Sequence, residues 1–177
     1  SSPITDGAAA VVLASEEKAR TLCDTPVWIS GSGHATDTIS LHNREDLLTL
    51  KATVEAGRQA FLQAKLEPKN IQVAEVHDCF TIAELLALED LGFVKKGESG
   101  KFTENRETEI GAKLPINTSG GLKAKGHPVG ASGIAQAIEA VLQLRGHAGK
   151  RNTNAETALT HNAGGTGGSA VVHIFTR

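Results

Sequence analysis

The feature that most constrains this chain is the alternation of short apolar runs with amphipathic helical segments, joined by glycine-rich loops. Strand-like apolar runs occupy residues 8–14, 27–33, 71–76, 155–159 and 169–175. Apolar side chains recur at helical spacing in residues 45–65, 81–91 and 131–145, and Ser15 can cap a brief helix after the first run. This alternation predicts an α/β fold in which helices sandwich a mixed sheet.

The same patterns predict finer features of these elements. Thr81 and Glu84 stand in capping-box relation at the start of the second long helix, and the polar residues 95–113 are expected to form a surface loop. Gly146 directly follows the last helix, a position where glycine commonly ends a helix. The residues expected to face the core are Leu47, Leu50, Val54, Phe61 and Ala64 in the first long helix and Ile134, Ile138, Val141 and Leu142 in the last.

Composition and charge argue against several classes of protein. The 177 residues are 40% hydrophobic, which is enough to bury the core of one domain. The 18 basic and 20 acidic residues give a net charge of −2 without any basic stripe, so no nucleic-acid partner is expected. No apolar run reaches the roughly 18 residues that a membrane span needs, so no membrane partner is expected.

Cysteine and methionine usage bears on the context of the chain. Cys23 and Cys79 lie far apart in the sequence and have no paired spacing, which favours a reducing, cytoplasmic location. The chain contains no methionine. We therefore expect that it begins inside a longer polypeptide.

The first loop that carries reactive side chains is the segment from His77 to Phe80 (HDCF), between the strand at 71–76 and the helix at 81–91. A thiol just ahead of a helix N-terminus lies near unpaired amide N–H groups, which favour the thiolate form of Cys79. Strand ends are also where α/β proteins bind ligands. The alternative is a buried cysteine that packs as a small hydrophobe beside a structural histidine.

The second loop covers residues 117–130 (NTSGGLKAKGHPVG) and leads directly into the helix at 131–145. Its glycines, including Gly126, allow the backbone to approach a ligand closely. His127 lies between Gly126 and Pro128, and a histidine at a helix entrance is poorly placed to pack in a core. A solvent-exposed loop histidine is the alternative.

The third loop covers residues 160–168 (THNAGGTGG), between two apolar strands. Four glycines in five positions predict a tight turn whose amides can point at one acceptor, as in an oxyanion hole. The alternative is an ordinary glycine-rich hairpin. Neither the GxxxxGK[ST] motif nor the GxGxxG motif of nucleotide-binding loops is present.

The three loops together place four reactive side chains at junctions between elements. We expect His77, Cys79, His127 and His161 to face a common space at one end of the sheet. The same four side chains could alternatively converge as the ligands of a zinc ion, because histidine and cysteine are its usual ligands.

Read in order, these loops resemble those of the thiolase superfamily, in particular the sterol-carrier-protein-type thiolases and their prokaryotic relatives. In the commoner thiolases the loops read NEAF, GHP and CxG. Here the first reads HDCF, the second reads GHPVGASG from Gly126 to Gly133, and His161-Asn162 stands in the third where the cysteine would be. The segment at 6–10 also resembles the strand that ends the family's N-terminal half, so the resemblance runs from about residue 5 to the C-terminus.

The resemblance implies the C-terminal half of an acyltransferase that makes or cleaves 3-ketoacyl-CoA by Claisen chemistry. His127 would activate the nucleophilic cysteine and help form an oxyanion hole that His77 supports. Cys79 would be the acid/base residue, moving a proton on and off the acetyl-CoA methyl carbon. Backbone amides from His161 onward would hold the oxyanion of the acyl-enzyme, with the His161 ring as a further donor. The residues expected to bind substrate or its oxyanion are Gly126, Asn162 and Gly164.

The resemblance also implies an incomplete enzyme. Residues 1–26 would end the N-terminal half and residues 27–177 would form the C-terminal domain, within a five-layered α-β-α-β-α architecture. The family's nucleophilic cysteine lies in the N-terminal half, and Cys23 lacks the small-residue loop and helix that such a nucleophile needs. We therefore expect no turnover by this chain alone, an N-terminal half on the same or another chain, and a homodimer or tetramer. Coenzyme A thioesters would be substrates, with no metal and no separate cofactor.

Other assignments stay open at this point. One is a different condensing enzyme with a Cys-His-His set that uses His127 and His161, although Cys79 argues against it. Another is a non-catalytic partner subunit, and a third is the metal-binding module described above.

Overall fold

The computed structural model describes all 177 residues and contains one four-stranded sheet. The strands are β1 (Trp28–Thr36), β2 (Val73–Glu75), β3 (Thr157–Gly164) and β4 (Ser169–Thr176). Their order across the sheet is β1-β4-β3-β2. β2 is parallel to β3, whereas β4 is antiparallel to both β1 and β3. The predicted mixed sheet is thereby confirmed.

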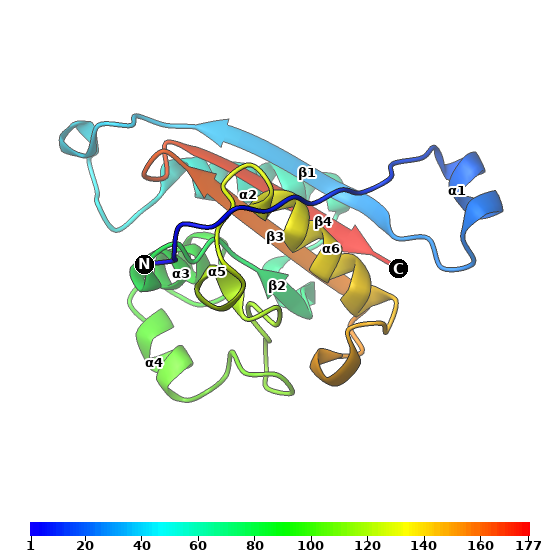
Figure 1. Cartoon of the computed structure of the whole chain (residues 1–177). Coiled ribbons are helices and arrows are strands. Elements are labelled where there is room, and N and C mark those ends of the chain that lie inside the picture. Colours follow the sequence, from blue (N-terminus) through cyan, green and yellow to red (C-terminus); the bar gives the residue numbers. More distant parts are fainter.

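Helices flank the sheet on both faces, and Figure 1 shows α6 crossing one face while α2 lies on the other. The helices are α1 (Glu16–Leu22), α2 (Lys51–Ala64), α3 (Thr81–Asp90), α4 (Ser99–Glu104), α5 (Gly121–Lys125) and α6 (Ser132–Leu144). Short 3-10 turns lie at Leu41–Asn43, Pro68–Asn70 and Gly149–Arg151. None of the helices combines the length and apolar character that crossing a bilayer requires.

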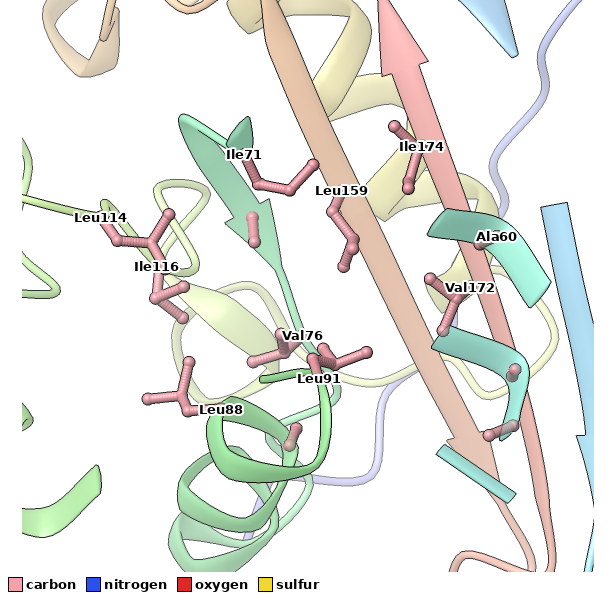
Figure 2. Packing of buried hydrophobic residues seen from close by; sticks show 14 of the residues in the cluster. Ala60, Ile71, Val76, Leu88, Leu91, Leu114, Ile116, Leu159, Val172 and Ile174 are labelled. Atoms are coloured by element: carbon pink, nitrogen blue, oxygen red, sulfur yellow. The ribbon is translucent and has the colours of Figure 1, made fainter. Parts of the chain in front are cut away.

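The strands divide their side chains between two cores. Leu159, Val172 and Ile174 point to the face covered by α2 and α3, where they pack in the larger cluster drawn in Figure 2. Ala158 and Phe175 alternate with them and point to the opposite face, against α6. The alternation along β3 therefore decides which helix each of its side chains meets.

Helix α2 lies unusually close to β1 because two glycines of the strand leave room for its backbone. A Cβ atom at Gly31 would lie 2.2 Å from the carbonyl oxygen of Ala60, and one at Gly33 would lie 1.9 Å from that of Ala56. The buried face of α2 consequently carries small residues, and the prediction that Leu47 and Val54 face the core is wrong, since both are exposed.

The start of this helix also differs from the prediction. The expected helix from residue 45 begins only at Lys51. The Asp46 carboxylate accepts hydrogen bonds from the Leu48 N–H and the Thr49 hydroxyl, and such local bonds compete with helix formation.

Helix α6 ends before Gly146 as predicted, and Gly146 adopts a positive φ of 71°. The prediction of its inward face is wrong. Ile134 is exposed, while Gln136, Glu139 and Gln143 are buried. These polar residues find partners inside the protein, so burying them leaves no unpaired group.

Three further expectations need correction. Residues 8–14 form no strand, because no neighbouring strand pairs with them, and Val12 is 92% exposed. α3 starts without a capping box, because Glu84 bonds the Asn117 side chain instead of the helix start. The expected surface loop at 95–113 contains the short helix α4.

Candidate active site

Three histidines converge at the edge of the sheet where β2 and β3 end. Because these two strands are parallel, the loop after β2 and the last residues of β3 meet at the same edge. The first supplies His77 and the second supplies His161 and Asn162. The loop before α6 adds His127, whose ring lies beside that of His77.

The His77 and His127 rings form an edge-to-face pair. Their centroids are 5.1 Å apart and their planes meet at 75°. Burial lowers the pKa of His77 to about 4, the nearby His127 contributes in the same direction, and Asp78 opposes the shift. His77 is therefore a neutral imidazole at physiological pH, able to donate from one nitrogen and accept at the other.

His127 is held by both its backbone and its ring. Its N–H donates to the Thr5 hydroxyl at 2.7 Å, and its Nδ1 lies 2.7 Å from the Ser132 hydroxyl. That hydroxyl donates its single proton to the Pro128 carbonyl at 3.1 Å. In the neutral ring, Nδ1 of His127 would then carry the proton in its bond to Ser132, and Nε2 would be the acceptor.

His161 lies inside β3 rather than in a loop and points to the α2 face of the sheet. Its side chain is 1% exposed, and burial lowers its pKa to about 3 with a smaller contribution from His77. Nδ1 accepts from the His77 N–H at 3.5 Å, and Nε2 lies 3.0 Å from the Thr53 hydroxyl. Both ring nitrogens are thus engaged by protein atoms.

Asn162 points to the opposite face, toward α6, because successive side chains of a strand alternate. Its Nδ2 atom lies 3.3 Å from Nδ1 of His77 and 3.0 Å from Oε1 of Gln136. Gln136 also donates from Nε2 to the His161 carbonyl at 3.0 Å.

Cys79 is half-buried two residues beyond His77, in the loop that leads into α3. Burial raises the pKa of its thiol, outweighing the backbone N–H groups of Phe80 and of Cys79 itself, which lower it. The expectation that the helix start favours the thiolate is therefore wrong for this chain, because α3 begins after Phe80 and desolvation dominates. Cys79 carries its proton at neutral pH.

Asp78 joins the first loop to the second. Its carboxylate accepts from the Leu122 N–H at 2.9 Å and 3.1 Å. A Cβ atom at Gly121 would lie 2.1 Å from Asp78 Oδ2, so this junction requires glycine. Asp78 was not among the residues predicted to act in the site.

The glycine-rich segment differs from the predicted oxyanion turn. His161, Asn162 and Gly164 belong to β3, and the tight turn comes after them. Within that turn the Gly167 N–H donates to the Gly164 carbonyl and the Gly168 N–H to that of Gly165. These two turn amides are consumed by the turn itself and do not point at a common acceptor.

The two other glycines expected near substrate have different surroundings. A Cβ atom at Gly126 would lie 2.7 Å from the Thr5 hydroxyl oxygen, and its φ is 85°, so both the conformation and the close approach of residues 1–14 call for glycine. Beside Gly164 there is open space. Cys23 lies at the end of α1 and accepts from the Arg145 guanidinium at 3.3 Å.

Besides Asp78, three residues of the site were missed by sequence reasoning: Thr53, Ser132 and Gln136. Each is a polar residue on the buried face of a helix. The signal available in the sequence was a polar side chain placed one or two turns from apolar ones, and that pattern also describes a solvated helix face. No group of three or more His, Cys, Asp or Glu side chains is arranged to hold a metal ion, so the zinc geometry considered above is not formed.

Comparison with known proteins identifies the class to which this fold and site belong. The family model described as thiolase C-terminal domain-like matches residues 33–177. The chain therefore belongs to the thiolase C-terminal domain-like family.

Individual relatives agree with this assignment. The chain is 58% identical over 177 residues to the acetyl-CoA acetyltransferase of Methanothermobacter thermautotrophicus, covering 99% of this chain and 46% of that protein. It is 42% identical over 179 residues to sterol carrier protein 2 of Oryctolagus cuniculus, covering 98% of this chain and 32% of that protein. The chain thus spans less than half the length of either relative.

A solved structure shares the fold. The Ltp2-ChsH2(DUF35) aldolase superposes with a TM-score of 0.78 and 29% sequence identity, covering 91% of this chain and 42% of that one.

Proposed function

We propose that this chain is the C-terminal half of a thiolase-type acyltransferase that makes or cleaves 3-ketoacyl-CoA by Claisen chemistry. The observation that carries the proposal is the pairing of the neutral His77 ring with His127, 5.1 Å apart, on two loops joined by Asp78. The 58% identity to an acetyl-CoA acetyltransferase along nearly the whole chain supports it.

His127 has the arrangement that a general base toward a thiol needs. With its proton held at Nδ1 by Ser132, its Nε2 can take the proton of a nucleophilic cysteine. The thiolate then attacks the acyl-CoA thioester, the bond from the carbonyl carbon to the CoA sulfur breaks, and an acyl-enzyme forms. The leaving CoA thiolate takes its proton from the Cys79 thiol. His127 keeps the proton on Nε2 until the nucleophilic cysteine is expelled again as a thiolate.

His77 and Cys79 suit the second half of the reaction. As its thiolate, Cys79 would take a proton from the methyl carbon of acetyl-CoA, and the negative charge would move to the thioester oxygen. A neutral His77 can donate a hydrogen bond to that oxygen. The enolate carbon then attacks the acyl-enzyme, a carbon–carbon bond forms, and the nucleophilic cysteine leaves. Because the Cys79 thiol is protonated at rest, the preceding half-reaction has to remove its proton.

The nucleophile would come from an N-terminal half, on the same or another chain. This chain covers 46% of the Methanothermobacter relative, which leaves room there for such a half. In this proposal Gly126, Asn162 and Gly164 line the acyl-CoA site, while His161 supports its shape from the core side.

The test supplies the missing half and reads the two half-reactions separately. The part of the Methanothermobacter acetyltransferase that this chain does not cover is fused ahead of it. Acyl capture is followed with radiolabelled acetyl-CoA, and proton exchange at the acetyl-CoA methyl group by NMR in deuterated buffer. Cys79→Ser should lower exchange by about 100- to 10,000-fold while acyl capture survives. His127→Ala should block acyl capture first.

The outcomes separate this function from its alternatives. Retained exchange in Cys79→Ser removes Cys79 from the mechanism. A fused enzyme that folds but never captures an acyl group contradicts the proposal and favours chemistry without an acyl-enzyme, or a non-catalytic partner subunit.

A further inference from the structure

Gln136 is a buried residue of α6 whose two amide atoms both bond to the segment that ends β3. Its side chain is 1% exposed. Nε2 donates to the His161 backbone carbonyl at 3.0 Å, and Oε1 lies 3.0 Å from Asn162 Nδ2. A backbone carbonyl only accepts hydrogen bonds, so the Gln136 amide is fixed with its nitrogen toward the strand and its oxygen toward Asn162.

This orientation determines the orientation of the next amide in the chain of bonds. An oxygen of Gln136 requires a donor, so Asn162 must present its NH₂ group rather than its carbonyl oxygen. One of the two hydrogens on that nitrogen is used by Gln136. The other faces His77 Nδ1, which lies 3.3 Å away.

The last member of the chain is the His77 ring. Since Nδ1 accepts from Asn162, the single proton of the neutral ring lies on Nε2. The burial of His77 keeps the ring neutral, so this tautomer is the one present at neutral pH. Had Asn162 turned its oxygen to Nδ1, the proton would sit on Nδ1, and Nε2 would be an acceptor.

We propose that Gln136 is a positioning residue that, through Asn162, holds His77 in the Nε2–H tautomer and so keeps a donor available for the thioester oxygen. The part concerning the thioester rests on the function proposed above; the tautomer assignment rests only on the hydrogen bonds. Without Gln136 the Asn162 amide can rotate, and the alternative tautomer places a lone pair where the enolate oxygen develops its charge.

The experiment uses the fused enzyme of the preceding section, labelled with ¹⁵N in its histidines. Long-range ¹H–¹⁵N spectra distinguish a protonated from an unprotonated ring nitrogen. In the parent enzyme His77 should be protonated at Nε2. In Gln136→Met, which has similar length and no hydrogen-bonding amide, a fraction protonated at Nδ1 should appear. The kcat for condensation should fall by up to about 100-fold, with KM changing much less.

A matched control is present on the same helix. Gln143 is also a buried glutamine of α6, but it bonds Glu139, Thr118 and Thr153 instead of the histidine segment. Gln143→Met should lose stability to a similar extent without changing the His77 tautomer. A merely structural role for Gln136 predicts the same result in both variants and would overturn the proposal.

The parent spectrum is decisive even if Gln136→Met does not fold. A parent His77 protonated at Nδ1 overturns the assignment. The experiment also distinguishes failure of this tautomer proposal from failure of the proposed acyltransferase function. A fused enzyme without acyltransfer, in which Gln136→Met still shifts the tautomer, rejects the acyltransferase and supports the tautomer assignment. An active enzyme whose tautomer and kcat are unchanged in Gln136→Met rejects the role of Gln136 alone.

Discussion

The chemistry available to each imidazole of this site is set by what holds its other nitrogen. Ser132 occupies Nδ1 of His127, and Asn162 occupies Nδ1 of His77. The first ring is thereby prepared as a base and the second as a donor, although both are histidines in glycine-rich surroundings. His161 has neither nitrogen free and so serves the site through its position.

Burial of uncharged histidines makes stability depend on pH. The pKa is about 4 for His77 and about 3 for His161 in the folded chain, against 6.5 for a free imidazole. Below pH 6.5 the unfolded chain binds protons that the folded chain does not, so the free energy of unfolding should fall as the pH decreases from 6.5 toward 4. Above pH 6.5 the contribution is complete. Each imidazole adds a slope of up to about 1.4 kcal/mol per pH unit.

Urea denaturation of the chain at a series of pH values between 7.5 and 5 measures this slope. His161→Gln should reduce this slope by the contribution of one imidazole, because the folded chain then holds one fewer buried imidazole that must stay neutral. His42→Gln, which removes an exposed imidazole, serves as the control. An equal slope in His161→Gln and the parent would contradict the argument.

At the scale of elements, the sequence predicted the strand and helix types well and the buried faces of the helices poorly. Apolar runs marked β2 and β3 because β2 and the first half of β3 are buried on both faces. In α6, however, Glu139 and Gln143 are buried because they find hydrogen-bond partners in Arg151 and Thr153. These partners lie outside the helix, where its apolar periodicity gives no sign of them. A hydrophobic pattern cannot indicate that a polar residue has a partner elsewhere in the chain.

The residues of the candidate site were likewise predictable only in part. His77 and His127 were predictable, because each lies in a short loop at the junction of two elements. That His161 lies inside a strand was not predictable from a glycine-rich segment, since the position of the turn depends on the pairing with β4. The hydrogen bonds that fix the tautomers come from Ser132 and Gln136, which only the packed structure brings near the imidazoles.

The contact between α2 and β1 gives a prediction at this scale. Gly33→Ala places a Cβ atom 1.9 Å from the Ala56 carbonyl oxygen, a backbone atom that cannot move aside by a rotamer change. The helix must shift away from the sheet, and the free energy of unfolding should fall by about 1–3 kcal/mol. Urea denaturation at pH 7.5 measures the change.

The control uses a glycine with open surroundings. A Cβ atom at Gly100 in α4 meets nothing within 4 Å, so Gly100→Ala should keep or raise stability, by up to about 1 kcal/mol. If Gly33→Ala is no less stable than the parent, the close approach of α2 is not a constraint on the fold.

For the whole molecule, the most conspicuous property is apolar surface that the chain itself does not cover. Residues 8–14 are an apolar run that pairs with no strand. Ile134 of α6 is exposed, on a helix whose polar residues are buried. A contiguous exposed apolar surface is typical of a surface that another polypeptide covers. In the function proposed above, the N-terminal half would cover this surface, and the chain itself spans less than half of each relative.

Assembly with the complementary half can be tested at the exposed run. Val12 is 92% and Leu13 75% exposed, so charging them should leave the stability of the chain itself nearly unchanged. Burying one such side chain contributes roughly 1.5–3 kcal/mol, so Val12→Asp should weaken binding of the separately expressed N-terminal half by about 10- to 100-fold. Sedimentation velocity titrations measure the affinity. Leu62→Asp on α2, at another exposed apolar position, is the control and should bind like the parent. Equal affinity for Val12→Asp and the parent would show that the run at residues 8–14 is not part of the interface.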